Sequence, residues 1–144
     1  MFTPVSMRSA NAYKKVAVET SVDGADSHQL IGMLYAALQQ SLSAAKYAIQ
    51  VKDIPAKGNA IGRAVRLLEE GLKASLNEAQ GGELAANLRG LYDYCIVVLS
   101  EANLRMDERK VDEVISLIEP VAQAWSQIRA EVTATAQSAT RHGA

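Results

Sequence analysis

Apolar side chains recur every three or four residues through four long segments of this chain. This spacing places them along one face of an α-helix, whereas a strand would need them to alternate with polar residues, and no such alternation persists in the sequence. The four segments span residues 27–51, 56–77, 83–103 and 108–134. Long helices joined by short connections pack in opposite directions, so the sequence predicts an all-α fold, an antiparallel four-helix bundle.

Turn and capping residues predict where these helices begin and end. Asp26 fits the N-cap of the first helix, with Gln29 three residues later to complete a capping box. Pro55 suits the opening turn of the second helix, and the pair Gly81-Gly82 separates the second helix from the third. Pro120 lies in the middle of the fourth helix and lacks the backbone N–H that a helix uses, so we expect a kink there.

The two ends of the chain carry less pattern than its middle. Residues 1–25 hold scattered apolar residues, so we expect a flexible N-terminal cap segment with a short helix or turn near Ala10–Val18. Residues 26–134 form the predicted four-helix bundle, and residues 135–144 are expected to be a disordered tail. A chain of 144 residues is long enough for one domain with a substantial core.

The third segment carries more apolar surface than one helix face needs. Its predicted buried stripe follows three- and four-residue spacing and consists of Leu84, Leu88, Leu91, Cys95 and Val98. Tyr92 and Tyr94 fall outside this stripe. Apolar and aromatic groups on more than one face indicate that this helix contacts something beyond its neighbours in the bundle.

Charge and composition exclude several classes of partner. A net charge of −1 provides no field that would attract nucleic acid, and Glu69 and Glu70 interrupt the basic residues of the second segment. The longest aliphatic run, Ile96–Leu99, is far too short to cross a bilayer, and the first residues lack the apolar core of a secretory signal. We therefore expect a soluble, cytoplasmic protein with no nucleic-acid partner and no membrane insertion.

The sequence offers no constellation for catalysis or metal binding. The two histidines, His28 and His142, have alanine rather than glutamate three residues before them, so the Glu-x-x-His pairs of di-iron bundles are missing. His28 lies in a first helical turn, where we expect a solvated ring, and the single cysteine, Cys95, lies in an apolar helix, which predicts a buried thiol. No phosphate-binding loop or nucleophile elbow is present. The sequence therefore predicts a protein that is not an enzyme and binds no metal or cofactor.

Recognition of another polypeptide is the function that remains. Aromatic side chains are scarce, so Tyr35, Tyr92, Tyr94 and Trp125 are the first candidates, although packing in the core or at its edge explains each of them nearly as well. Apolar residues outside the main stripes predict a groove between helices that accepts an amphipathic segment. Tyr13, in the loose N-terminal segment, is placed to cover such a groove temporarily.

Several motifs, taken in order along the chain, carry a resemblance to a known family. They are the tyrosine segment beginning at Tyr13, the first-helix sequence Leu30–Tyr35, the diglycine motif from Gly81 to Tyr94, the short motif Glu101–Asn103, and the fourth-helix segment from Val111 to Trp125. In order and spacing they resemble the flagellar secretion chaperone family FliS, over nearly the whole domain. One difference is that Ala36-Ala37 follow Tyr35 where the family usually has an acidic residue and a glycine.

This resemblance implies a cytoplasmic bundle that binds the C-terminal segment of flagellin, prevents its premature polymerisation and delivers it, through a transient contact, to the export apparatus at the membrane. The expected partner-binding residues are Tyr13, as part of a displaceable cap, and the groove candidates Ile31, Leu34, Tyr35, Leu68, Leu72, Tyr92, Tyr94 and Trp125. The same apolar surplus has an alternative interpretation, a structural or signalling bundle that self-associates and has no flagellin client.

Overall fold

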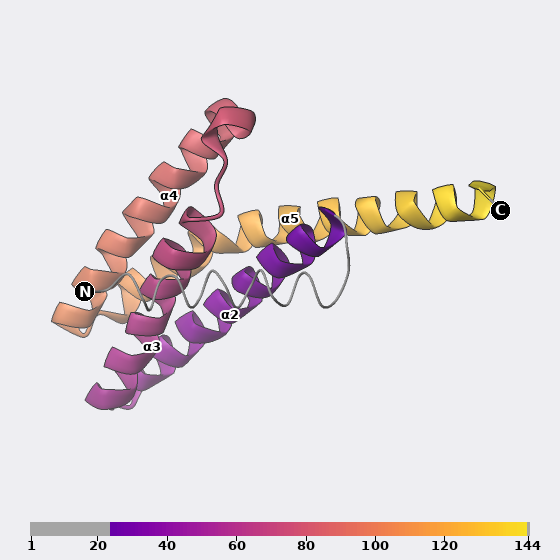
Figure 1. Cartoon of the computed structure of the whole chain (residues 1–144). Coiled ribbons are helices and arrows are strands. Elements are labelled where there is room, and N and C mark those ends of the chain that lie inside the picture. Colours follow the sequence, from indigo (N-terminus) through magenta and orange to yellow (C-terminus); the bar gives the residue numbers. More distant parts are fainter. Residues whose placement is uncertain (1–23, 144) are drawn as a thin grey trace, which may run out of the picture.

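The computed structural model describes the backbone of residues 24–143 and the side chains of residues 27–128. This part of the chain forms four helical stretches and contains no strand (Figure 1). Helix α2 spans Gly24–Gln50, α3 spans Ile54–Arg66 and continues as the π-helix η1 at Leu67–Lys73, α4 spans Glu78–Arg105, and α5 spans Glu108–Gly143. The predicted all-α bundle is confirmed. Most of the predicted cap segment, including Tyr13, lies outside the described residues.

Neighbouring helices run in opposite directions. Helices α2 and α5 are joined near one end by an ion pair of 2.8 Å between Lys46 and Asp112, and near the other end by the indole N–H of Trp125, which donates to the carbonyl of His28 at 2.9 Å. The same antiparallel order joins α3 and η1 to α4, through contacts of Lys57 with Asn103 and of Lys73 with Asp93. The bundle is therefore antiparallel, as the short connections predict.

The core lies toward one end of the bundle. Apart from Ala85, the buried apolar residues of the described part lie at 34–49 in α2, 61–72 in α3 and η1, 92–102 in α4 and 111–118 in α5. We call the end where α2 and α4 finish and α3 and α5 begin the closed end. The opposite end, formed by residues 27–33, 74–91 and 119–128, is the open end, where α4 and the second half of α5 diverge (Figure 1).

The second predicted helix begins earlier and ends sooner than expected. Asp53 caps α3 by accepting a 3.2 Å hydrogen bond from the backbone N–H of Ala56, and Pro55 lies in the first turn, as predicted. The helix widens into η1 at Leu67 and stops at Lys73, four residues before the predicted end. A Cβ at Gly71 would lie 3.0 Å from Leu34, so glycine is what allows η1 to pack this closely on α2.

Three other boundaries differ from the sequence predictions. Helix α2 already includes Asp26, so the prediction that Asp26 is its N-cap is wrong. Helix α4 begins at Glu78 with Asn77 as its cap, and the predicted glycine break falls inside it, at Gly82, whose φ is 55°. Helix α5 continues through Pro120 and extends to Gly143, beyond the predicted end at 134. The division into cap, bundle and tail stays a prediction.

The buried face of α4 agrees with the predicted stripe except at Leu84. Cys95 and Val98 are buried as predicted, and Tyr92, which was placed outside the stripe, is buried beside them at 2% exposed, whereas Leu84 is 67% exposed. Leu84 is at the open end, beyond the buried parts of the other helices, and no helix of the described residues covers it. Periodicity alone could not predict this exposure, because it does not tell where the neighbouring helices end. Cys95 is buried, as predicted, and burial raises the pKa of its thiol to about 11.

Candidate functional site

A hollow without charged residues lies between α2 and α5 near the open end. Its lining comes from both helices: Gly32, Tyr35, Ala36, Gln39, Ala122, Trp125 and Ser126. Gly32 lies beneath the indole ring, since a Cβ there would be 3.8 Å from Cδ1 of Trp125. The small residues Gly32 and Ala36 leave the floor of the hollow open, so it is suited to accept an apolar side chain from another polypeptide.

Trp125 forms one wall of this hollow and is held in place by the first turns of α2. Its ring stacks on that of His28 with centroids 4.6 Å apart, and its N–H donates to the carbonyl of His28. The ring of Tyr35 lies 6.4 Å away in a tilted arrangement. The predicted solvated ring of His28 is therefore wrong, because stacking covers it and its Nδ1 is buried without a partner among the described residues.

A hydroxyl pair crosses the core beneath the hollow. The hydroxyls of Tyr35 on α2 and Tyr92 on α4 lie 2.5 Å apart, and either can be the donor. Burial raises the pKa of Tyr92, with the hydrogen bond to Tyr35 adding to the effect, and burial also raises the pKa of Tyr35. Both tyrosines are thus neutral near neutral pH, and their bond links two helices whose backbones do not touch.

A second hollow lies between the start of α2 and the connection that follows η1. Its lining residues are Ser27, Leu30, Ile31, Leu34 and Ser75, again without a charge. Ser75 Oγ donates to the carbonyl of Gly71 at 2.6 Å, which ends η1 and fixes this rim. Both hollows therefore border the first half of α2, one on each side.

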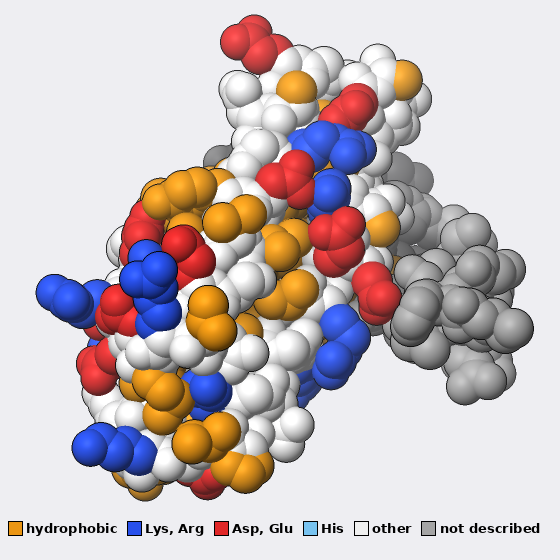
Figure 2. Space-filling view, turned by 90° about the vertical axis from the view of Figure 1, so that its left-hand side faces the viewer, with side chains coloured by type: hydrophobic (Ala, Val, Ile, Leu, Met, Phe, Trp, Pro, Cys, Tyr) orange, Lys and Arg blue, Asp and Glu red, His pale blue; other side chains and the backbone are white. Residues whose placement is uncertain are grey.

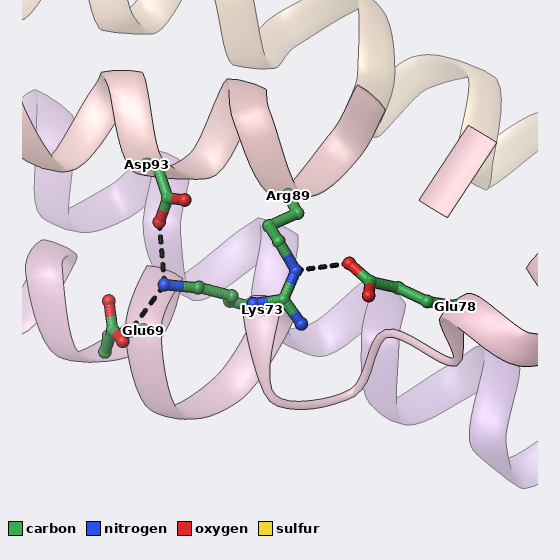
Figure 3. Close-up of polar contacts among 5 residues, drawn as sticks. All are labelled: Glu69, Lys73, Glu78, Arg89 and Asp93. Atoms are coloured by element: carbon green, nitrogen blue, oxygen red, sulfur yellow. Dashed lines mark hydrogen bonds and ion pairs between the residues drawn. The ribbon is translucent and has the colours of Figure 1, made fainter. Parts of the chain in front are cut away.

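Ion pairs join η1 to the middle of α4 and connect the two parts of α4 on either side of Gly82. Lys73 lies between Glu69, at 3.3 Å, and Asp93 on α4, at 2.7 Å, while Arg89 pairs with Glu78 (Figure 3). The hydrogen bond to Asp93 is the main cause that raises the pKa of the Lys73 ammonium. Because these groups are partly exposed, they position the connection between η1 and α4 without contributing much stability.

The outward face of α4 also carries exposed apolar side chains. Leu84, Tyr94, Val97 and Leu104 are 49–82% exposed. Figure 2 views the side of the molecule where α4 lies and shows hydrophobic side chains exposed between acidic and basic ones. The Tyr94 hydroxyl donates to Glu113 of α5, and this hydrogen bond is the main cause that raises the tyrosine pKa.

The predicted partner-binding residues fall into three groups. Ile31, Tyr35 and Trp125 are brought together along the walls of the two hollows, with Leu34 at the edge of one of them. Leu68, Leu72 and Tyr92 are buried in the core. Leu34 and Tyr35 are buried there too, although they also border a hollow, so packing explains all five in the free chain. Tyr94 faces outward on α4, away from both hollows, and Tyr13 lies outside the described residues. Their role in binding a partner stays a prediction.

The sequence did not predict the small and neutral residues that line the hollows. Gly32, Ala36 and Gln39 give no aromatic or charged signal. One signal was available, since the stretch from Gln29 to Gln50 contains a single charged residue, Lys46. An amphipathic surface helix normally carries charges on its solvent face, so their absence points to a contact surface.

Metal-binding clusters and membrane-spanning helices are both absent from the part of the chain that the structure describes. Among them, no group of three or more His, Cys, Asp or Glu side chains is placed to hold a metal ion. None of the helices in residues 24–143 combines the length and hydropathy that crossing a bilayer requires. The hollows on either side of α2 are the features on which the functional argument below rests.

Comparison with known proteins identifies a family over the same region. The model of the family described as "Flagellar protein FliS" matches residues 9–132. The flagellar secretion chaperone FliS of Salmonella typhimurium is 44% identical over 117 residues, which cover 81% of this chain and 87% of that protein. FliS of Vibrio cholerae is 36% identical, covering 85% of this chain and 90% of that protein, and FliSB of Pseudomonas aeruginosa is 37% identical, covering 85% and 97%.

Proposed function

This chain belongs to the FliS family of flagellar proteins, and we propose that it binds the C-terminal segment of flagellin in the cytoplasm, keeps that segment from polymerising early, and delivers it to the export apparatus at the membrane. The relatives' shared name, flagellar secretion chaperone, supports a role as a chaperone rather than an enzyme. The flagellin segment as client and the transient contact with the export apparatus are parts of the proposal.

The observation that carries the proposal is the charge-free lining of the two hollows at the open end. None of their lining residues is charged, and Leu30, Ile31 and Trp125 present apolar surface there. An amphipathic segment that folds as a helix would place its apolar side chains in such hollows and leave its polar face in water. The first half of α2, which has a hollow on each side, would then be the element that the client contacts most.

Coupled folding and binding explains how the complex stays reversible. A disordered client that folds on the chaperone buries on the order of 1,000–3,000 Å² but spends roughly 2–5 kcal/mol on becoming ordered. The affinity is thereby reduced without loss of the large contact surface. A client held in this way can be protected in the cytoplasm and still be released for export.

The proposal is tested by filling a hollow and measuring client binding. Ala36→Leu adds a bulky side chain to the floor of the hollow beside Trp125, whereas Ala86→Leu makes the same change on an exposed position of α4. Isothermal titration with flagellin should show that the parent protein binds with a negative heat-capacity change. Ala36→Leu should bind at least about tenfold more weakly, and Ala86→Leu should bind like the parent. Flagellin lacking its last forty residues or so, a length able to cover such an interface, should not bind.

Two results would contradict the proposal. If flagellin without its C-terminal segment binds as tightly as the full protein, the client segment is wrong. If Ala36→Leu and Ala86→Leu leave the affinity equally unchanged, the hollow does not contact the client. A bundle that shows only self-association in the same titration would favour the alternative function, a structural or signalling bundle without a flagellin client.

The proposed role of Tyr13 needs a separate test. Removing residues 1–20 deletes the predicted displaceable cap and should change the affinity for a flagellin C-terminal peptide while the helical circular dichroism signal remains. Unchanged affinity would reject the cap.

A further inference from the structure

The solvent-facing side of α2 is unusually poor in charge. Of the residues from Gln29 to Gln50, Lys46 alone is charged, and it pairs with Asp112 of α5. The exposed positions of this stretch are instead occupied by Met33, Gln40, Ala44 and Tyr47, among others. Depletion of charge, with aromatic and methionine side chains in its place, distinguishes the centre of a protein interface from ordinary surface.

Six residues on this side follow the spacing of a coiled-coil seam. They alternate at intervals of four and three residues and are Met33, Ala37, Gln40, Ala44 and Tyr47 of α2, and Val51, which directly follows the helix and whose N–H donates to the carbonyl of Tyr47 at 3.0 Å. We call them the outer seam. Met33, Tyr47 and Val51 are 56%, 65% and 51% exposed, and Ala37 is half-buried, so the described part of the chain leaves the seam largely uncovered. It lies apart from the buried side of α2, where Leu34, Leu38 and Leu42 pack into the core.

The outer seam is complementary to itself when reversed. In an antiparallel pair of α2 helices centred on Leu42, Met33 lies opposite Val51, Ala37 opposite Tyr47, and Gln40 opposite Ala44 of the second copy. A large residue thus meets a smaller one in each of these layers. A twofold interface requires this property, because every contact is made twice with the partners exchanged. We propose that two copies of this chain associate through their outer seams as an antiparallel, twofold-symmetric helix pair.

Electrostatics does not oppose this association. The seam itself is uncharged, so no ion loses its hydration when two seams meet. Each copy has a net charge of −1, which produces little long-range repulsion. Because no ion pair holds the two copies together, the affinity should be insensitive to salt.

The size of the seam predicts a weak dimer. From Met33 to Val51 it is about 27 Å long at about 1.5 Å per residue. A single helix pair of this length buries well under about 1,200 Å² in total, the range of transient contacts. We therefore expect a dissociation constant between roughly 1 μM and 1 mM, so that the dimer forms only at high protein concentration.

Analytical ultracentrifugation of the full chain over that concentration range tests the proposal. The parent protein should shift from monomer to dimer. Gln40→Lys and Ala44→Glu, measured separately, should each weaken the dimer at least about tenfold, because each puts two like charges into neighbouring layers of the seam. An equimolar mixture of the two variants should dimerise again, since the new ammonium then faces the new carboxylate across one layer.

Leu104→Lys is the matched control, because it introduces the same charge at an exposed apolar position of α4, which is 82% exposed. It should leave the dimer unchanged. Circular dichroism checks that all variants remain folded. Raising the salt from about 0.05 M to about 0.5 M should not dissociate the parent dimer.

Several results would overturn the proposal. A parent protein that stays monomeric throughout the concentration range rules the dimer out, and hydrogen exchange would then show whether the client covers the seam instead. A dimer that both seam variants leave intact, or that Leu104→Lys weakens equally, places the interface elsewhere. A mixture of the two variants that fails to restore association rejects the antiparallel register.

Discussion

The closed and open ends of this bundle are built from the same amphipathic helices but differ in how much apolar surface they bury. At the closed end the four helices bury Leu42, Leu99 and Val114 completely. At the open end the same helices continue, but Leu84 and Ile128 are 67% and 44% exposed, and the ion pair between Lys73 and Asp93 lies just beside it. Stability thus comes mainly from one end, which leaves the other free to present apolar surface.

The largest expected effect compares two leucines of the same helix. Leu99→Ala removes a fully buried side chain at the closed end and should lower the free energy of unfolding by about 2–5 kcal/mol. Leu84→Ala removes an exposed side chain at the open end and should change it by less than about 0.5 kcal/mol. Urea unfolding measures both. Equal losses would mean that the two ends contribute alike and would break the comparison.

The hydroxyl pair at the boundary between the two ends should give the next largest effect. Tyr35→Phe or Tyr92→Phe leaves the other hydroxyl buried without its partner, which should cost about 1–3 kcal/mol of stability. The double variant should cost less than the sum of the two single variants, because no unpaired hydroxyl remains. Additive losses in urea unfolding would show that the two hydroxyls do not interact.

The raised pKa values of Tyr35 and Tyr92 predict a loss of stability in alkali. An ionised tyrosine is favoured in the unfolded chain, where the pKa is about 10, so the two buried phenols stabilise the fold fully below that pH. As the pH rises above about 10, the unfolded chain loses these protons first and the free energy of unfolding falls. Unfolding curves between about pH 9 and pH 11 should show a shallower decline for the Tyr35→Phe/Tyr92→Phe protein. An identical decline in both proteins would contradict the assignment.

The smallest effect is expected from the ion pairs of Lys73, which lie beside the open end. Lys73→Met removes the ammonium that pairs with Glu69 and Asp93 and should change stability by less than about 1 kcal/mol. Hydrogen exchange around Asp93, in the middle of α4, should nevertheless increase, because this contact positions that part of the helix against η1. Protection unchanged there, or lost equally at the closed end, would show that the pair does not act locally.

Part of the candidate site could be predicted from the sequence. Ile31, Tyr35 and Trp125 were identified as large apolar or aromatic groups in helical segments, and they do line the hollows. Gly32 and Ala36 were not predicted, because a small residue indicates a hollow only when the position of the neighbouring helix is known. Tyr92 was placed outside the buried stripe, since its partner, the hydroxyl of Tyr35, is 57 residues away in the chain.

By itself, the sequence determined what depends on near neighbours in the chain. The three- and four-residue periodicity specified helices, Pro55 indicated the opening turn of one of them, and Gly82 specified a break. Only the tertiary structure decided which side of each helix is covered, and over what length of the helix. It explains why Leu84 is exposed, why Lys57 is buried, and where hollows flank α2. Periodicity defines a face of a helix, but burial depends on where the partner helices end and diverge, and that is set by contacts between residues far apart in the chain.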